Sequence, residues 1–202
     1  MNSILPDEIT LNTSPAGSAL EPAVAAVKTG GIIAYPTEAV YGLGCDPFNE
    51  NAVNQLKQLK GRPAQKGFLL IASDWAQVAD LVAPLTAEQV AKVQATWPGP
   101  ITWVFPASQQ APAWICEYNA DNQASIALRI TAHPIANQLC QQLQQPIVST
   151  SANLSSEPAL KTGNAVMQSF RDKINYVIMG AVGELTKPTV IYDVLTDKIL
   201  RN

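Results

Sequence analysis

The chain has 202 residues, of which 47% are apolar and only 14% are charged, and its formal net charge is −3. This composition supplies a full hydrophobic core and excludes intrinsic disorder, which requires low hydrophobicity and high charge. A protein that holds nucleic acid by bulk electrostatics is basic overall, so any contact with nucleic acid must come from a local patch.

The sequence also disfavours membrane, secreted and histidine-rich metal proteins. No apolar run approaches the ~20 residues that cross a bilayer, and residues 1–8 lack the basic start and apolar stretch of a signal peptide, so we expect neither a membrane segment nor a signal peptide. The cysteines Cys45, Cys116 and Cys140 lie far apart, which predicts reduced thiols in a cytoplasmic protein. The single histidine, His133, excludes a histidine-rich metal site.

Short apolar segments alternate with amphipathic ones along the chain. In order, we predict a helix over 18–28, a strand over 32–35, a helix from Asn49 through Leu59, a strand over 68–72, and helices over 74–82 and 87–96. We then predict strands over 101–105 and 125–130, a helix from Pro134 through Leu143, a strand over 147–150, and a hairpin of 189–194 with 198–200. The strands of this hairpin are too close in the chain for a parallel crossover, so the pattern predicts an α/β fold with a mixed sheet.

Three of these helices carry a start signal, and for the helix that ends at Leu59 it is the N-cap residue Asn49. Ser18 with Glu21, and Thr86 with Gln89, have the spacing of a capping box.

The chain shows no internal repeat and no boundary between domains. We expect a single domain over residues 1–202, with residues 1–17 as a loosely attached N-terminal segment. The irregular stretches 107–123 and 154–163 are long for passive connections, so we expect lids or binding loops there.

Two polar motifs accompany the first two predicted strands. The motif PTEAVYGLGCD at residues 36–46 has glycines that let backbone approach a ligand closely, although an ordinary glycine turn would use the same residues. The loop KGRPAQKG at residues 60–67, together with Lys57, contains four of the 13 basic residues. Either it is a solvated basic turn, or it holds a polyphosphate, with Arg62 bidentate and Lys60 as a point charge.

Two more polar features accompany later strands. Arg129 lies at the tip of the strand 125–130 and, if buried, needs an anionic partner, which is either an internal carboxylate or a substrate carboxylate. We expect His133, just beyond it, to be structural. The segment STSAN at residues 149–153 follows a strand and suits an anion or phosphate, unless it is a helix cap or a Ser/Thr turn.

Together these features predict a concave basic cavity for a polyanion and a small carboxylate-bearing molecule. The sequence near them has no dense acidic cluster, so we predict no metal site built by the protein alone. Magnesium ions (Mg2+) would be carried mainly by the phosphates of the substrate.

With WPGPIT at residues 97–102, these motifs occur in the order seen in YrdC-like threonylcarbamoyl-AMP synthases, and residues 20–201 resemble the short bacterial form of that family. The resemblance implies a twisted mixed sheet flanked by helices, with a concave basic cavity. It implies a nucleotidyltransferase that condenses L-threonine, bicarbonate or CO2, and ATP into threonylcarbamoyl-AMP and pyrophosphate. Downstream transfer proteins would pass the threonylcarbamoyl group to ANN-decoding tRNAs, so we expect any tRNA contact to be weak or indirect.

The resemblance also implies roles for individual residues. Thr37 and Arg129 would hold threonine, with Arg129 at its carboxylate, while Lys60 and Arg62 would be the catalytic residues. The residues around the nucleotide would be Lys60, Arg62, Thr102, Ser149, Ser151 and Asn153. Two departures concern ligand contacts: residues 66–68 read KGF where many relatives have HPL, and residues 188–190 read PTV instead of STV.

Two other functions stay open at this point. A non-catalytic RNA-binding protein would use the same basic cavity without turning over a substrate. A serine or cysteine acyl hydrolase would use Ser149, Ser151 or Cys45 as its nucleophile, with His133 as its only candidate base.

Overall fold

The computed structural model describes residues 20–63, 65–154 and 157–201. The predicted N-terminal segment 1–17 and the predicted cap Ser18 lie outside these residues. The first described helix, α1 (Glu21–Lys28), follows Leu20, and its C-cap is Thr29. This confirms the predicted end of the helix at residue 28.

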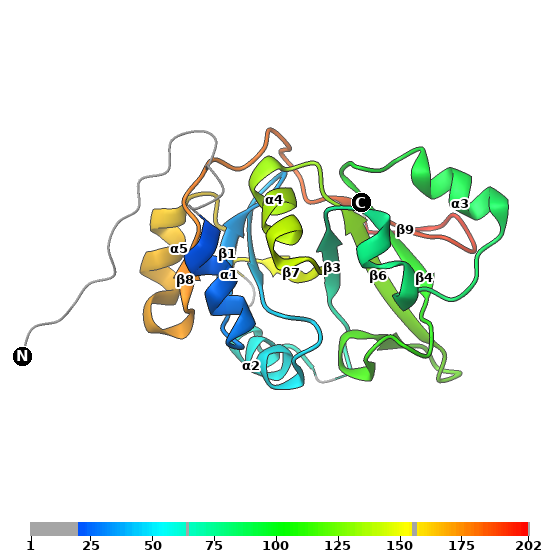
Figure 1. Ribbon diagram of the computed structural model, residues 1–202, viewed down its shortest axis with the longest axis horizontal. Helices are drawn as coiled ribbons and strands as arrows, with labels where there is room; N and C mark the ends of the chain where they lie inside the picture. Colours follow the sequence, from blue (N-terminus) through cyan, green and yellow to red (C-terminus); the bar gives the residue numbers. More distant parts are fainter. Residues whose placement is uncertain (1–19, 64, 155–156, 202) are drawn as a thin grey trace, which may run out of the picture.

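Ten strands form one sheet (Figure 1). Their spatial order is β10 (Ile199–Arg201), β9 (Val190–Asp193), β4 (Ile101–Pro106), β6 (Ala124–Ile130), β3 (Leu69–Ala72), β7 (Ile147–Ser151), β2 (Tyr41–Gly44), β1 (Ile33–Pro36) and β8 (Tyr176–Val177), while β5 (Glu117–Tyr118) pairs with β6. The pair β3–β6 is parallel, whereas β7 is antiparallel to both β3 and β2. The predicted mixed sheet is therefore confirmed, as is the C-terminal hairpin, in which β9 and β10 are antiparallel.

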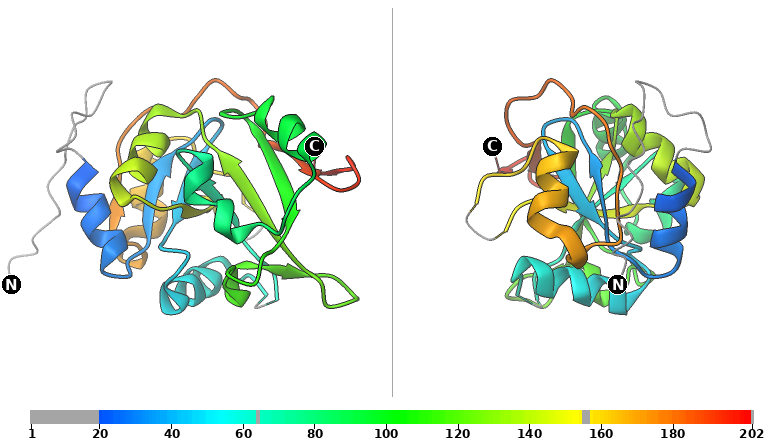
Figure 2. Two further views of the ribbon diagram at one scale, coloured as in Figure 1. Left: turned by 45° about the vertical axis from the view of Figure 1, so that its right-hand side comes forward. Right: turned by 90° about the vertical axis from the view of Figure 1, so that its left-hand side faces the viewer.

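The helices pack on both faces of this sheet (Figure 2). Besides α1 they are α2 (Glu50–Lys60), α3 (Ala87–Gln94), α4 (Pro134–Leu143) and α5 (Gly163–Phe170). Along β1 the side chains alternate between two apolar clusters, as strand geometry requires. Ile33 and Tyr35 pack in the cluster that includes α1 and α4, whereas Ala34 belongs to the cluster that holds Leu56 of α2 and Phe170 of α5.

The helix ends follow the predicted caps where these are described. The side chain of Asn49 accepts a hydrogen bond from the backbone of Ala52 at the start of α2. Thr86 and Gln89 form both hydrogen bonds of a capping box at the start of α3. The predicted helix over 74–82 is wrong, because this segment forms two short 3-10 turns, Trp75–Gln77 and Ala79–Leu81.

The reason for the 3-10 turns is local. The side chain of Asp74 accepts a hydrogen bond from the Gln77 backbone and so stabilises a single turn. Val82 is already extended, and Pro84 two residues later disfavours a helical residue before it.

The glycine-rich part of the motif at residues 36–46 is a strand and not a turn. The turn comes earlier, where Thr37 donates from its backbone and its hydroxyl to the carbonyl of Val40, and β2 then pairs antiparallel with β1. A Cβ atom on Gly44 would lie 2.3 Å from the backbone oxygen of Val148. This close approach to β7 explains a glycine inside a strand.

The irregular stretches contain elements that the sequence pattern did not reveal. Residues 107–123 include a 3-10 turn (Ala113–Ile115) and β5, and after residues 154–163 come the unpredicted helix α5 and strand β8. Within the described residues, no helix is long and apolar enough to cross a membrane.

Candidate active site

A cavity of about 1060 Å³ lies among the strands β2, β4, β6, β7, β9 and β10 and their neighbouring loops. Five predicted site residues line it: Thr37, Arg62, Arg129, Ser149 and Ser151. Among the described charged residues, its walls contain three arginines, Arg62, Arg129 and Arg201, and two acids, Glu117 and Asp193. The cavity therefore has a small excess of positive charge, next to serine and threonine hydroxyls.

Lys60 lies beside this wall as the last residue of α2. Its Nζ donates to the carbonyl oxygens of Ser151, at 2.8 Å, and Asn153, at 2.6 Å, and to Oδ1 of Asn153, at 2.8 Å. The Ser151 hydroxyl donates to the same Oδ1 at 2.7 Å. The structure thus joins three predicted phosphate-binding residues from two distant parts of the chain.

The ammonium of Lys60 is held in a partly dry position. Burial, with a smaller effect from the nearby Arg62, lowers the pKa of Lys60 to about 8. Gly61 has φ 57° and ends α2 in the left-handed conformation that glycine adopts without strain. This turn leads the chain directly from Lys60 to Arg62.

Arg62 is fixed by its own loop. Its Nε and Nη2 both donate to the carbonyl oxygen of Gly67, and its guanidinium lies 4.9 Å from the centre of the Phe68 ring. A Cβ atom on Gly67 would lie 2.6 Å from the carbonyl oxygen of Ile115, so this position has no room for a side chain. The KGF departure therefore places Gly67 and Phe68 against Arg62, whereas Lys66 is exposed.

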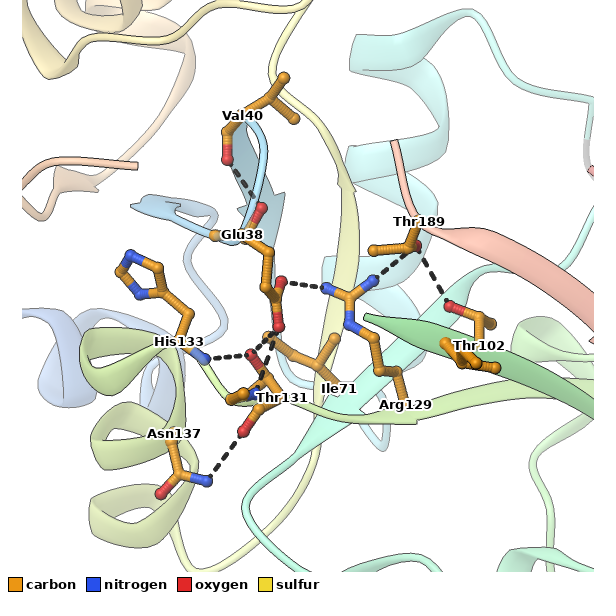
Figure 3. Close-up of polar contacts among 12 residues, drawn as sticks. Glu38, Val40, Ile71, Thr102, Arg129, Thr131, His133, Asn137 and Thr189 are labelled. Atoms are coloured by element: carbon orange, nitrogen blue, oxygen red, sulfur yellow. Dashed lines mark hydrogen bonds and ion pairs between the residues drawn. The ribbon is translucent and has the colours of Figure 1, made fainter. Parts of the chain in front are cut away.

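Arg129 is almost fully buried, and it has an internal carboxylate as its partner (Figure 3). Its Nη2 lies 3.0 Å from Oε2 of Glu38, and its Nη1 donates to the hydroxyl of Thr189 at 2.9 Å. Of the two partners left open for Arg129, the structure contains the internal one. A substrate carboxylate on the same guanidinium remains a prediction.

Gly42 keeps the space between two other predicted residues open. A Cβ atom on it would lie 3.3 Å from Cγ2 of Thr37 and 3.4 Å from the hydroxyl oxygen of Ser149. Thr37, just after β1, and Ser149, within β7, are both nearly buried, yet they line the cavity from the two sides of β2. The missing side chain thus leaves room for a small ligand.

Thr102 is placed differently from the other nucleotide-binding candidates. It is fully buried, and its hydroxyl lies 3.4 Å from that of Thr189, whereas Thr189 itself lines the cavity. The PTV departure therefore still presents a hydroxyl to the site, and Thr102 supports it from behind.

Two residues of the site were missed by the sequence analysis. Glu38 was visible in the motif at residues 36–46, and the need of Arg129 for an anion was the signal that could have paired them. Arg201, in the edge strand β10, donates from Nη2 to the carbonyl oxygen of Thr189 at 2.9 Å. Burial and the nearby Arg129 lower the pKa of Arg201. No sequence pattern marks Arg201, because only the sheet order brings it to the cavity.

The basic residue Lys57 does not line the cavity, although it was grouped with this loop. It is buried, and its Nζ donates to the carbonyl oxygen of Trp114 at 2.7 Å. Lys57 therefore joins α2 to the segment 113–115.

The geometry does not assemble the parts of an acyl hydrolase. Nε2 of His133 lies 3.1 Å from the carbonyl oxygen of Ala181, and in the described part of the chain no hydrogen bond joins it to Ser149, Ser151 or Cys45. Burial raises the pKa of the Cys45 thiol far above neutrality. His133 thus has the structural surroundings that we expected.

The chain is similar to known proteins over most of its length. A family model described as "Telomere recombination" and named for Sua5, YciO and YrdC matches residues 25–202. A threonylcarbamoyl-AMP synthase of Coxiella burnetii is 49% identical over 89% of this chain and 94% of its own length. One from Vibrio vulnificus is 43% identical over 91% of this chain and 98% of its own length.

A solved structure of P. abyssi Sua5 complexed with L-threonine is similar to this one with a TM-score of 0.80 and 31% identity. The match covers 89% of this chain and 52% of that one, so the chain spans about half the length of that protein. From the matched residues and the identity to both curated relatives, the chain belongs to the Sua5/YciO/YrdC family.

Proposed function

We propose that the chain is a threonylcarbamoyl-AMP synthase, a nucleotidyltransferase that serves the threonylcarbamoyladenosine modification of tRNA. The observation that carries this proposal is the cavity itself. It brings the cationic end of α2 together with the hydroxyls of β7 on one side, and with the buried Arg129 and Thr189 on another. These are the two chemistries that a nucleotide and an amino acid require.

The reaction is the one that the resemblance to threonylcarbamoyl-AMP synthases implies. The amine of threonine attacks CO2, supplied as such or from bicarbonate, and loses a proton to give a carbamate. A carbamate oxygen then attacks the α-phosphorus of ATP, and pyrophosphate leaves with the electrons of the broken P–O bond. No covalent enzyme intermediate is needed, so catalysis consists of positioning and of charge stabilisation.

Each group has a place in this scheme. Arg129, with Thr37 near it, binds threonine through its carboxylate. Lys60, Arg62, Ser149, Ser151 and Asn153 surround the nucleotide, where the two cations offset the negative charge of the phosphates. Thr102, assigned to the nucleotide by the family resemblance, is buried and acts on the cavity through its contact with Thr189.

Magnesium would bind with the nucleotide. Within the described residues, no group of three His, Cys, Asp or Glu side chains is placed to hold a metal ion. The ion would therefore take its oxygen ligands mainly from the phosphates and water, and it would help to neutralise them.

We place the reaction in the cytoplasm, upstream of the proteins that transfer the threonylcarbamoyl group to ANN-decoding tRNAs. The formal net charge of −3 disfavours the alternative of a non-catalytic RNA-binding protein, because binding of nucleic acid by bulk electrostatics requires a basic protein. Contact with tRNA would accordingly be weak or indirect.

The test is pyrophosphate release from ATP by the purified protein. We expect release that requires threonine and bicarbonate together, with little signal when either is left out. Serine and bicarbonate form the matched control, since serine lacks only a methyl group. Release that does not depend on threonine and bicarbonate would overturn the proposal.

A further inference from the structure

Glu38 lies behind Arg129, away from the cavity. Arg129 and Thr189 line the cavity, whereas Glu38 does not, and its side chain is only 10% exposed (Figure 3). Glu38 therefore reaches a bound ligand only through Arg129.

The two oxygens of the Glu38 carboxylate have different hydrogen-bond partners. Oε2 accepts from Nη2 of Arg129, while Oε1 accepts from the hydroxyl of Thr131 at 2.6 Å and from the backbone of Ala132 at 3.3 Å. A carboxylate that pairs only with an arginine frequently accepts two parallel hydrogen bonds from the guanidinium, one at each oxygen. Here the second oxygen instead fixes the angle at which the first one meets the guanidinium.

This single contact leaves donors of Arg129 available. A guanidinium has five N–H groups, of which Glu38 takes one and Thr189 another. Nε of Arg129 is buried and has no hydrogen-bond partner among the described residues. Because Nε is shielded from solvent, the donors left for an anionic ligand in the cavity are the second N–H groups of Nη1 and Nη2.

The backbone of Glu38 is also held in place. Gly183 donates to the carbonyl oxygen of Thr37 at 2.9 Å, and Leu185 donates to that of Glu38 at 3.1 Å. A Cβ atom on Gly183 would lie 2.6 Å from the carbonyl oxygen of Glu38, so the segment packs tightly here. This segment leads on to β9 and Thr189 (Figure 1). Glu38 and Thr189, the two hydrogen-bond partners of the Arg129 guanidinium, are thus linked through the segment 183–189.

Folding stability alone does not explain the Glu38–Arg129 ion pair. A buried salt bridge loses much of its Coulomb energy to desolvation, and apolar residues of the same shape are often as stable. Burial by itself would raise the pKa of Glu38, but the Arg129 charge and the Thr131 hydrogen bond outweigh it and lower the pKa. The Glu38 carboxylate therefore stays charged, although its burial costs solvation free energy.

From this geometry we propose that Glu38 is a positioning residue for threonine, which holds the Arg129 guanidinium at the angle where its free donors meet the substrate carboxylate. The inference rests on the proposed function. It predicts that a change at Glu38 acts on threonine and not on ATP, because the Glu38 carboxylate is hydrogen-bonded to Arg129, the residue assigned to the threonine carboxylate.

The test is Glu38→Gln, which keeps the size of the side chain and removes its charge. We expect the KM for threonine to rise about tenfold, because a misaligned arginine loses much of its contact, while the KM for ATP changes less than about twofold. Asp197→Asn is the matched control, since it neutralises the acid of the Lys92–Asp197 ion pair, whose two residues do not line the cavity. Its two KM values should stay at the wild-type level.

A second variant guards against misfolding of the first. Thr131→Val removes the hydrogen bond to Oε1 and leaves the ion pair, so we expect a smaller rise in the KM for threonine, about threefold. Calorimetric titration with threonine alone should show the same order of affinities. An unchanged KM for threonine in both variants, or an equal rise for ATP, would overturn the inference. Absence of threonine-dependent release by the wild type would instead overturn the proposed function.

Discussion

At the scale of single residues, backbone carbonyls fix two of the cations in the site. Lys60 reaches the carbonyls of Ser151 and Asn153, and Arg62 reaches that of Gly67. A carbonyl fixes a cation in place without cancelling its full charge, which suits a site for phosphates. Arg129 differs, because a carboxylate holds it.

The pKa of Lys60 predicts that nucleotide binding depends on pH. Because its pKa is lowered to about 8, its ammonium loses the proton as the pH rises through that value, and its attraction for phosphate is lost. The affinity for a non-hydrolysable ATP analogue should therefore fall by up to about tenfold between about pH 7 and about pH 9. Isothermal titration at each pH measures this affinity without turnover.

The matched variant for this experiment is Lys60→Arg. Arginine stays charged throughout this range, so its affinity for the analogue should be lower than that of the wild type but independent of pH. A flat profile for the wild type would show that the charge of Lys60 does not contribute to nucleotide binding.

At the scale of elements, the strand β2 contains two glycines that are required for different structural reasons. Gly44 faces the backbone of β7 with no space for a Cβ atom. Gly42 faces the cavity between Thr37 and Ser149, and a Cβ atom there would have its shortest contact, 3.3 Å, with Cγ2 of Thr37. One glycine therefore serves packing, and the other serves the site.

Two alanine variants separate these roles. Gly44→Ala should destabilise the fold by about 1–3 kcal/mol, because the strand must move away from Val148. Gly42→Ala should unfold close to the wild-type temperature but raise the KM for threonine several-fold. Thermal unfolding and pyrophosphate kinetics measure the two effects, and the reverse pattern would contradict our reading of this strand.

At the scale of the whole molecule, the cavity is built from both halves of the chain. Thr37 comes from the turn between β1 and β2, and Arg201 comes from the opposite edge strand of the sheet. A ligand that bridges them binds only the folded state, so it must stabilise the entire fold.

Thermal unfolding tests this linkage. ATP and threonine at about 100 times their Kd should each add about 2.7 kcal/mol and raise the Tm by about 5–10 °C. In Lys60→Ala the shift by threonine should persist, while the shift by ATP is largely lost. If neither ligand moves the Tm of the wild type, the cavity is not their binding site.

Local signals in the sequence predicted most elements of the fold. The capping box at Thr86, the N-cap Asn49 and the apolar strand 68–72 all depend on neighbours within a few residues, so they can be read directly. The 3-10 turns after Asp74, the glycine strand β2 and the two-residue strand β8 could not. Their conformation depends on tertiary partners or on weak local hydrogen bonds.

The sequence by itself determined the class of fold, the four polar motifs and the chemistry of their side chains, because these follow from composition, periodicity and residue type. Only the tertiary structure decided which of these side chains meet. It placed Glu38 on Arg129, brought Arg201 to the cavity and put Thr102 behind Thr189. The reason is physical: strand order and register bring distant residues together, and neither is a property of local sequence.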